Sequence, residues 1–155
     1  MGGRLRPVLV TTYQFGKYVE IGDPVSQAKI YEAQAADELI ILDLDASTES
    51  RSTLVDVVRK AAEVIFMPFT VGGGVRTVDD FVTLLSNGAD KVSINTAAVE
   101  SPELIDRAAS ALGSQCVVLS IDYRKDDSGK YSVWTRGGTV ECGIDPVEWA
   151  KEGEG

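Results

Sequence analysis

Two segments of the sequence carry residues of the kind that bind phosphate groups. The glycine run 72–74 follows an apolar segment, and Asn95 and Thr96 close the next apolar segment along the chain. Glycines let backbone N–H groups approach an anion, and amide and hydroxyl side chains can donate hydrogen bonds to it. If the two segments end neighbouring strands, Gly74, Asn95 and Thr96 form one phosphate cradle. A tight turn without a ligand is the alternative interpretation of the glycines.

Two carboxylates occupy comparable positions at the ends of apolar runs. Asp43 and Asp122 each follow such a run, and a carboxylate there can act as a general acid or base on a phosphorylated substrate. Asp122 is the stronger candidate of the two. The chain has no histidine, which excludes Ser-His-Asp and Cys-His catalysis and histidine metal sites. Its two cysteines form no metal-binding or disulfide pattern, so we expect neither a metal nor another cofactor.

These residues lie in a chain that alternates between short apolar runs and longer amphipathic segments. Apolar strands separated by helices are typical of a parallel sheet that is buried on both faces. An Asp-Asp-Ser-Gly turn within 123–140 predicts a β-hairpin after the fifth strand. The predicted strands are 6–11, 39–44, 66–71, 91–94 and 116–121, and the predicted helices are 24–36, 51–64, 77–87, 101–112 and a start near 145–152.

The pattern predicts an α/β fold in a single domain, 1–155, but leaves two architectures open. The 155 residues accommodate about four to five βα units, whereas a (βα)8 barrel needs about 200–250 residues. The chain is therefore either an incomplete, truncated barrel of the TIM type or an open doubly wound sheet, which five strands would complete. Spacing alone does not choose between them.

Charge and hydropathy narrow the range of partners. The formal net charge is −9, with 15 Lys and Arg against 24 Asp and Glu, so nucleic acid is not an expected partner. No apolar run approaches the 18 or more residues of a membrane span, and the segment 1–7 lacks the apolar core of a signal peptide. We expect a cytoplasmic protein that binds a phosphorylated small molecule and no membrane.

Five motifs together resemble the cyclase subunit of imidazole glycerol phosphate synthase, an enzyme of histidine biosynthesis. The resemblance implies a (βα)8 barrel built from two similar halves, of which this chain carries about five βα units. It implies a lyase that condenses ammonia from a glutaminase partner with a phosphoribulosyl-formimino aminoimidazole carboxamide ribonucleotide. The motifs are DELIILDLDAS (37–47), PFTVGGGVRTVDD (68–80), GADKVSINTAAVESPELI (88–105), GSQCVVLSID (113–122) and GIDPVEWAKE (143–152).

The resemblance assigns roles to single residues. The second catalytic aspartate of the family falls on Asp122, whereas the first falls on Val10, and Asp43 matches an acid near the active face. The family's first phosphate site maps onto the cradle proposed above. The charged gate through which ammonia enters the barrel corresponds to Arg4, Glu38 and Lys91.

Val10 and the expected incompleteness of the barrel leave several functions open. The isolated chain is expected to lack the full cyclisation activity, because one of two acid or base groups is replaced. The alternatives are a non-catalytic phosphate-binding or purely structural fragment, and a truncated amidine-forming relative from surface-sugar biosynthesis. Because an incomplete barrel leaves strand edges and apolar surface open, we also expect a homo-oligomer.

Overall fold

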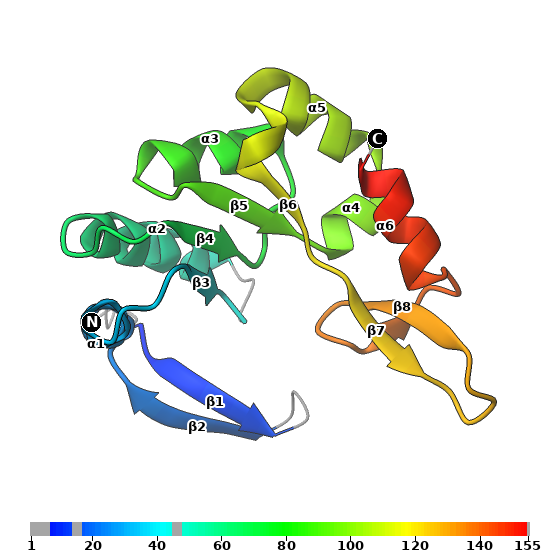
Figure 1. Cartoon of the computed structure of the whole chain (residues 1–155), viewed down its shortest axis with the longest axis horizontal. Coiled ribbons are helices and arrows are strands. Elements are labelled where there is room, and N and C mark those ends of the chain that lie inside the picture. Colours follow the sequence, from blue (N-terminus) through cyan, green and yellow to red (C-terminus); the bar gives the residue numbers. More distant parts are fainter. Residues whose placement is uncertain (1–6, 14–16, 45–47, 155) are drawn as a thin grey trace.

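The centre of the molecule is a curved parallel sheet with helices along one side (Figure 1). The computed structural model describes residues 7–13, 17–44 and 48–154. Its four parallel strands are arranged in the order β3-β4-β5-β6, which is also their order along the chain. This arrangement of alternating strands and helices confirms the predicted βα units. The strands are β3 (Leu39–Leu42), β4 (Phe69–Gly72), β5 (Lys91–Ile94) and β6 (Val117–Leu119).

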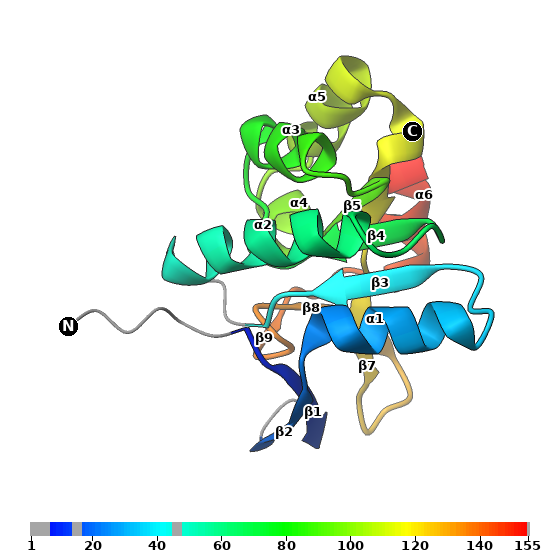
Figure 2. The same ribbon diagram turned by 90° about the vertical axis from the view of Figure 1, so that its left-hand side faces the viewer.

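Six helices accompany the strands in the described part of the chain. Four of them, α1, α2, α3 and α5, follow the outer side of the sheet in Figure 1, and Figure 2 shows α1 and α2 running alongside β3. None of the described helices is long and apolar enough to cross a membrane. The helices are α1 (Pro24–Ala33), α2 (Thr48–Ala62), α3 (Val78–Ser86), α4 (Thr96–Glu100), α5 (Glu103–Leu112) and α6 (Pro146–Glu154).

Local capping explains where two of these helices begin. The Asp23 carboxylate accepts a hydrogen bond of 2.8 Å from the backbone N–H of Ser26, and Pro24 occupies the first helical position of α1. Thr77 and Asp80 form a capping box at the start of α3, in which each side chain accepts a hydrogen bond from the other residue's backbone N–H. Both starts therefore depend on residues within one helical turn of each other.

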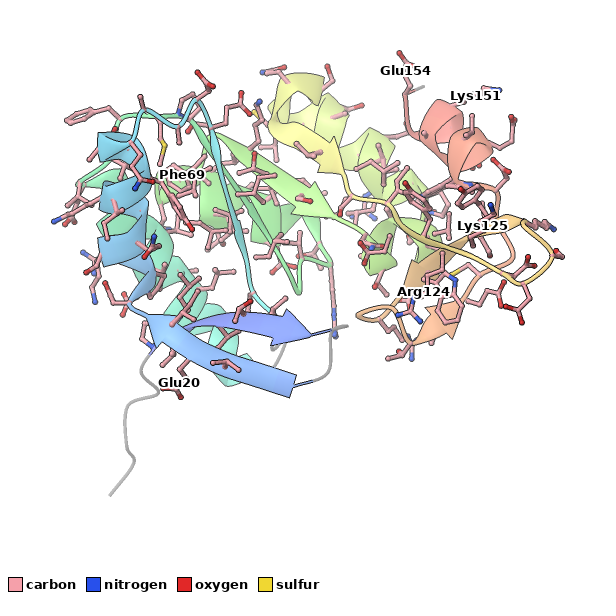
Figure 3. All side chains as sticks on the ribbon, turned by 60° about the horizontal axis from the view of Figure 1, so that its bottom comes forward. Glu20, Phe69, Arg124, Lys125, Lys151 and Glu154 are labelled. Carbon is pink, nitrogen blue, oxygen red and sulfur yellow. The ribbon has the colours of Figure 1, made fainter. Side chains whose placement is uncertain are left out.

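The core lies between the sheet and the outer helices. Val58 on α2, Val71 on β4, Phe81 on α3 and Val92 on β5 are fully buried there. All four residues of β4 are buried, and the strand lies between β3 and β5 in the sheet. Figure 3 labels Phe69, which begins β4 and belongs to the same core.

Strand β4 begins later than the predicted strand 66–71. Pro68 has no N–H to donate to a sheet, and the Glu32 carboxylate accepts hydrogen bonds from the backbone N–H groups of Phe66 and Met67. These two residues are therefore held by a side chain of α1's last turn instead of by a neighbouring strand. The regular ladder with β3 starts at Phe69.

The described part of the first predicted strand 6–11, residues 7–11, is not part of the parallel sheet. Residues of that run instead form β1 (Leu9–Tyr13), which pairs antiparallel with β2 (Lys17–Gly22) in a separate two-stranded sheet. The prediction of five parallel strands is therefore wrong for the described residues, which contain four. An apolar run has the same appearance in a buried parallel strand and in a hairpin, so its periodicity could not separate the two.

The second hairpin lies where the turn sequence placed it. Strands β7 (Asp122–Lys125) and β8 (Tyr131–Thr135) are antiparallel, and a short third strand, β9 (Val140–Glu141), pairs with β8. The two hairpins occupy opposite ends of the curved sheet in Figure 1. Helix α4, which follows β5 directly, and strand β9 were not predicted.

Candidate functional site

The carboxyl ends of the parallel strands bring the predicted site residues to one edge of the sheet. The register pairs Gly72 of β4 with Ser93 of β5, so the glycine turn and Asn95 lie just beyond neighbouring strand ends. The backbone N–H of Asp43 donates to the carbonyl of Gly72 at 2.9 Å, which places Asp43 beside the same turn. The strand order therefore brings Asp43 and Gly72, 29 positions apart in the chain, and Gly72 and Ser93, 21 positions apart, beside one another.

Asn95 and Asp122 are in direct contact. The Nδ2 atom of Asn95 donates a hydrogen bond of 2.9 Å to Oδ2 of Asp122, and the contact is partly buried. Asn95 stands at the N-cap position of α4, but its side chain makes no capping bond there, since its amide is directed to Asp122. Its Oδ1 atom is buried and has no hydrogen-bond partner among the described residues. This acceptor could take a hydrogen bond from an N–H or O–H group of a ligand.

The glycine turn is shaped by close packing against β3. Gly73 has φ +99°, and a Cβ atom there would overlap the backbone carbonyl oxygen of Asp43. Gly74 follows with φ +66° and lines a small pocket of about 50 Å³ together with Thr83. Two consecutive positive φ values explain why this turn consists of glycines.

The candidate residues do not all line one cavity. A cavity of about 560 Å³ lies between β1, α1, β3 and α2, and both Val10 and Asp43 line it. Val10 belongs to the antiparallel hairpin, where it pairs with Glu20, and not to the parallel strand on which the resemblance places the first catalytic aspartate. Its side chain nevertheless reaches the same cavity as Asp43, and it brings no acid or base to it.

The predicted gate residues lie at the opposite end of the sheet. The Nζ atom of Lys91, the first residue of β5, is 3.3 Å from Oε1 of Glu38, which directly precedes β3. Both side chains are partly exposed to solvent, as expected for charged groups at the amino ends of the strands. Arg4 lies outside the described residues.

The structure adds one residue that the sequence analysis missed. The backbone N–H of Arg136, in the turn after β8, donates a hydrogen bond of 3.0 Å to Oγ1 of Thr96. The guanidinium group of Arg136 forms an ion pair of 2.8 Å with Glu100 on α4. Forty residues separate Arg136 from Thr96, and the sequence signals only a turn there, through Gly137 and Gly138.

The site therefore combines three kinds of group at the carboxyl end of the sheet. Asp122 supplies a carboxylate that can accept or donate a proton, and Asn95 orients it. Thr96 supplies a hydroxyl group, and Gly74 lies in the turn that follows the neighbouring strand β4. This set suits a small phosphorylated molecule on which a proton is moved.

Comparison with known proteins identifies the group to which this chain is related. Residues 5–155 match the family described as "Histidine biosynthesis protein". The imidazole glycerol phosphate synthase subunit HisF of Caulobacter vibrioides, from strain NA1000 / CB15N and from strain ATCC 19089 / CIP 103742 / CB 15, is 56% identical over 132 residues. The match covers 84% of this chain and 51% of each relative, so the chain spans about half the length of the curated relatives it matches. The match to the family extends over nearly every residue of the sequence, and this chain belongs to the histidine biosynthesis protein family.

Proposed function

We propose that this chain forms part of a (βα)8-barrel cyclase that makes imidazole glycerol phosphate in the cytoplasm, as a step of histidine biosynthesis. The observation that carries the proposal is the hydrogen bond of 2.9 Å between Asn95 and Asp122. It joins a residue of the predicted phosphate cradle to the predicted acid or base. Identity of 56% with HisF subunits over most of the chain supports the same assignment.

The proposed roles follow from the positions of the side chains. Asp122 exchanges the proton during ring closure, and Asn95 keeps its carboxylate facing the substrate. Gly74 and Thr96 hold the phosphate group at the carboxyl ends of β4 and β5. Asp43, which lines the neighbouring cavity, contacts the part of the substrate farther from the phosphate.

The amino end of the sheet is proposed to receive the ammonia. Glu38 and Lys91 form a charged pair there that can open and close a path through the sheet, with Arg4 as a third member. The side chain of Phe66 is 93% exposed at the same end, which suits the docking of a glutaminase subunit. A glutaminase subunit that docks there would deliver ammonia to the end of the sheet opposite the phosphate cradle.

The experiment that tests the proposal supplies ammonia directly. The purified chain is incubated with an ammonium salt and the phosphoribulosyl-formimino substrate, and imidazole glycerol phosphate is measured. We expect the self-associated chain, in which a second copy completes the barrel, to show slow turnover, because Val10 replaces one acid or base group, and we expect this turnover to be lost in Asp122→Asn. Equal turnover in the wild-type chain and in Asp122→Asn would contradict the catalytic assignment.

A second candidate function is the binding of a phosphorylated ligand without turnover. It is favoured by Val10, whose apolar side chain lines the cavity at the position where the resemblance calls for an aspartate. The same residue is compatible with an amidine-forming relative that uses another sugar. If the chain only binds its ligand, we expect Asp122→Asn to keep its affinity for ribose 5-phosphate and Gly74→Val to lose it. We also expect no product to form with ammonia.

A further inference from the structure

The three residues of the predicted phosphate cradle include no positively charged group. Gly74, Asn95 and Thr96 are uncharged, whereas the nearby Asp122 carboxylate, 2.9 Å from Asn95, repels an anion when it is ionised. A phosphate ester carries about 1.5 to 2 negative charges at neutral pH. Uncharged donors alone therefore have to overcome both the desolvation of this anion and the repulsion.

Arg136 is a cation that is already attached to this cradle. Its backbone N–H donates to Thr96 Oγ1 at 3.0 Å, so the first atoms of its side chain lie close to that hydroxyl group. A threonine hydroxyl that accepts one hydrogen bond still has its own hydrogen to donate to a ligand. The contact between Arg136 and Thr96 therefore does not block the cradle.

The turn that carries Arg136 is held in an unusual backbone conformation. Arg136, Gly137 and Gly138 have φ values of +53°, +65° and +73°, and the first of these is rare for a residue with a side chain. Thr139 closes the turn, since its hydroxyl donates to the carbonyl oxygen of Arg136 at 2.8 Å. Backbone strain of this kind is found preferentially at functional sites.

The same turn packs tightly over a second arginine. A Cβ atom on Gly138 would come within 2.7 Å of the Nη2 atom of Arg124. The guanidinium carbon of Arg124, which is labelled in Figure 3, in turn lies 4.5 Å from the centre of the Trp134 ring. These contacts place the turn against Arg124 of β7, and Arg136 reaches α4 from this turn.

The present partner of the Arg136 guanidinium is easily exchanged. Its ion pair with Glu100 measures 2.8 Å, but the two side chains are 66% and 54% exposed. Exposed pairs of this kind contribute little to stability, whereas an arginine binds phosphate oxygens strongly through two parallel hydrogen bonds. A phosphate bound at Thr96 would thus compete with Glu100 for the same guanidinium group.

We propose that Arg136 is a phosphate-binding residue that leaves Glu100 and binds the ligand's phosphate group at Thr96. The proposal rests on the phosphate site of the proposed function and adds to it the cation and a competing internal anion. Glu100 then competes with the ligand's phosphate for this guanidinium group and lowers the apparent affinity. The ligand class is a small phosphomonoester, because the phosphate must reach both the Thr96 hydroxyl and the guanidinium.

Isothermal titration of the full chain with ribose 5-phosphate tests this, with ribose as the phosphate-free control. Arg136→Met is expected to weaken binding of ribose 5-phosphate about tenfold. Glu100→Gln is expected to tighten it about threefold, because the guanidinium is released. If Glu100 acts through Arg136, its substitution has no effect in the double variant with Arg136→Met.

The outcomes separate this proposal from the proposed function. If wild-type chain binds ribose 5-phosphate no better than ribose, the phosphate site itself is wrong and this proposal is lost with it. If the wild-type chain prefers ribose 5-phosphate but Arg136→Met leaves its affinity unchanged, only the role of Arg136 is overturned. Tightening by Glu100→Gln that is equal in both backgrounds also overturns it, because it would show simple repulsion by Glu100.

A matched ion pair on the outer surface supplies the control. Arg59 on α2 and Glu63, directly after α2, are joined at 3.3 Å and are similarly exposed, and Arg59 also contacts Asp56 at 3.4 Å. Arg59→Met and Glu63→Gln change the net charge of the chain by the same amounts as the test variants. Their affinities for ribose 5-phosphate are expected to equal that of the wild type, and shifts as large as those of the test variants would overturn the local role of Arg136.

Discussion

At the residue scale, two phenylalanine side chains lie in opposite environments, one in the core and one in solvent. Phe81 on α3 is fully buried among the residues that join α2, α3 and the sheet. Phe66, before β4, is 93% exposed, although its backbone N–H is held by Glu32. The contribution of an aromatic ring to stability depends on the area it removes from water and on the atoms that surround it. The two positions therefore form a natural comparison.

The comparison gives a stability prediction. Phe81→Ala leaves a cavity in the core and is expected to lower the free energy of unfolding by about 3–5 kcal/mol. Phe66→Ala removes a ring that faces water and is expected to change it by less than about 0.5 kcal/mol. Urea denaturation followed by circular dichroism measures both. A loss of several kcal/mol in Phe66→Ala would show that the ring is covered in solution, for example by a partner.

At the element scale, the glycine turn after β4 packs closely against the backbone that follows β3. Gly73→Ala forces a Cβ atom into the backbone of Asp43 at a φ of +99°. Gly137→Ala is the matched control, since its φ is +65° and no atom lies within 4 Å of the added Cβ. We expect Gly137→Ala to cost about 1 kcal/mol, the ordinary penalty of a left-handed residue, and Gly73→Ala at least twice as much. Equal shifts in thermal midpoint would contradict the close packing of this turn.

The β7–β8 turn should respond to acid. Hydrogen bonds from the Ser128 hydroxyl and from the backbone N–H of Lys130 lower the pKa of Asp126 from its ordinary value of 3.8. A carboxyl whose pKa is depressed by folding stabilises the turn above its unfolded pKa, and this contribution disappears as the pH falls through the depressed value. We expect the amide resonances of this turn to shift below about pH 4. Ser128→Ala should move the midpoint upwards, and an unchanged midpoint would show that the hydroxyl is not a partner in solution.

At the scale of the whole molecule, one side of the sheet carries apolar surface that the described residues leave open. Ile40 and Leu42 on β3, which line the cavity beside β1 and α1, are 62% and 54% exposed, and among the described residues β3 pairs only with β4. Apolar side chains next to an open strand edge favour association with another sheet. Self-association through this surface would cover both features at once.

Light scattering over a range of concentrations tests the association. We expect a mass above that of one chain, and a shift towards the monomer in Ile40→Lys, which places a charge on the open surface. Val147→Lys is the control, because Val147 is 61% exposed on α6, away from the edge of β3. A monomer at all concentrations in the wild-type chain would show that this surface is not used between copies.

Some features of this protein follow from its sequence alone. The starts of α1 and α3 depend on Asp23 and on Thr77 with Asp80, which act on backbone groups only three residues away. Strand β5 lies at the predicted residues 91–94, and the candidate residues Asn95 and Asp122 follow predicted strands. Such features can be predicted from the sequence because capping and strand alternation are set by near neighbours in the chain.

Other features were decided only by tertiary structure. Whether the run near Val10 joins the parallel sheet or pairs with β2 depends on which pairing is more stable in the folded molecule. The contacts of Asn95 with Asp122 and of Arg136 with Thr96 join residues 27 and 40 positions apart. The strand order and the seating of the β7–β8 hairpin create these contacts. No local pattern encodes them, because their energies arise only once distant elements have packed together.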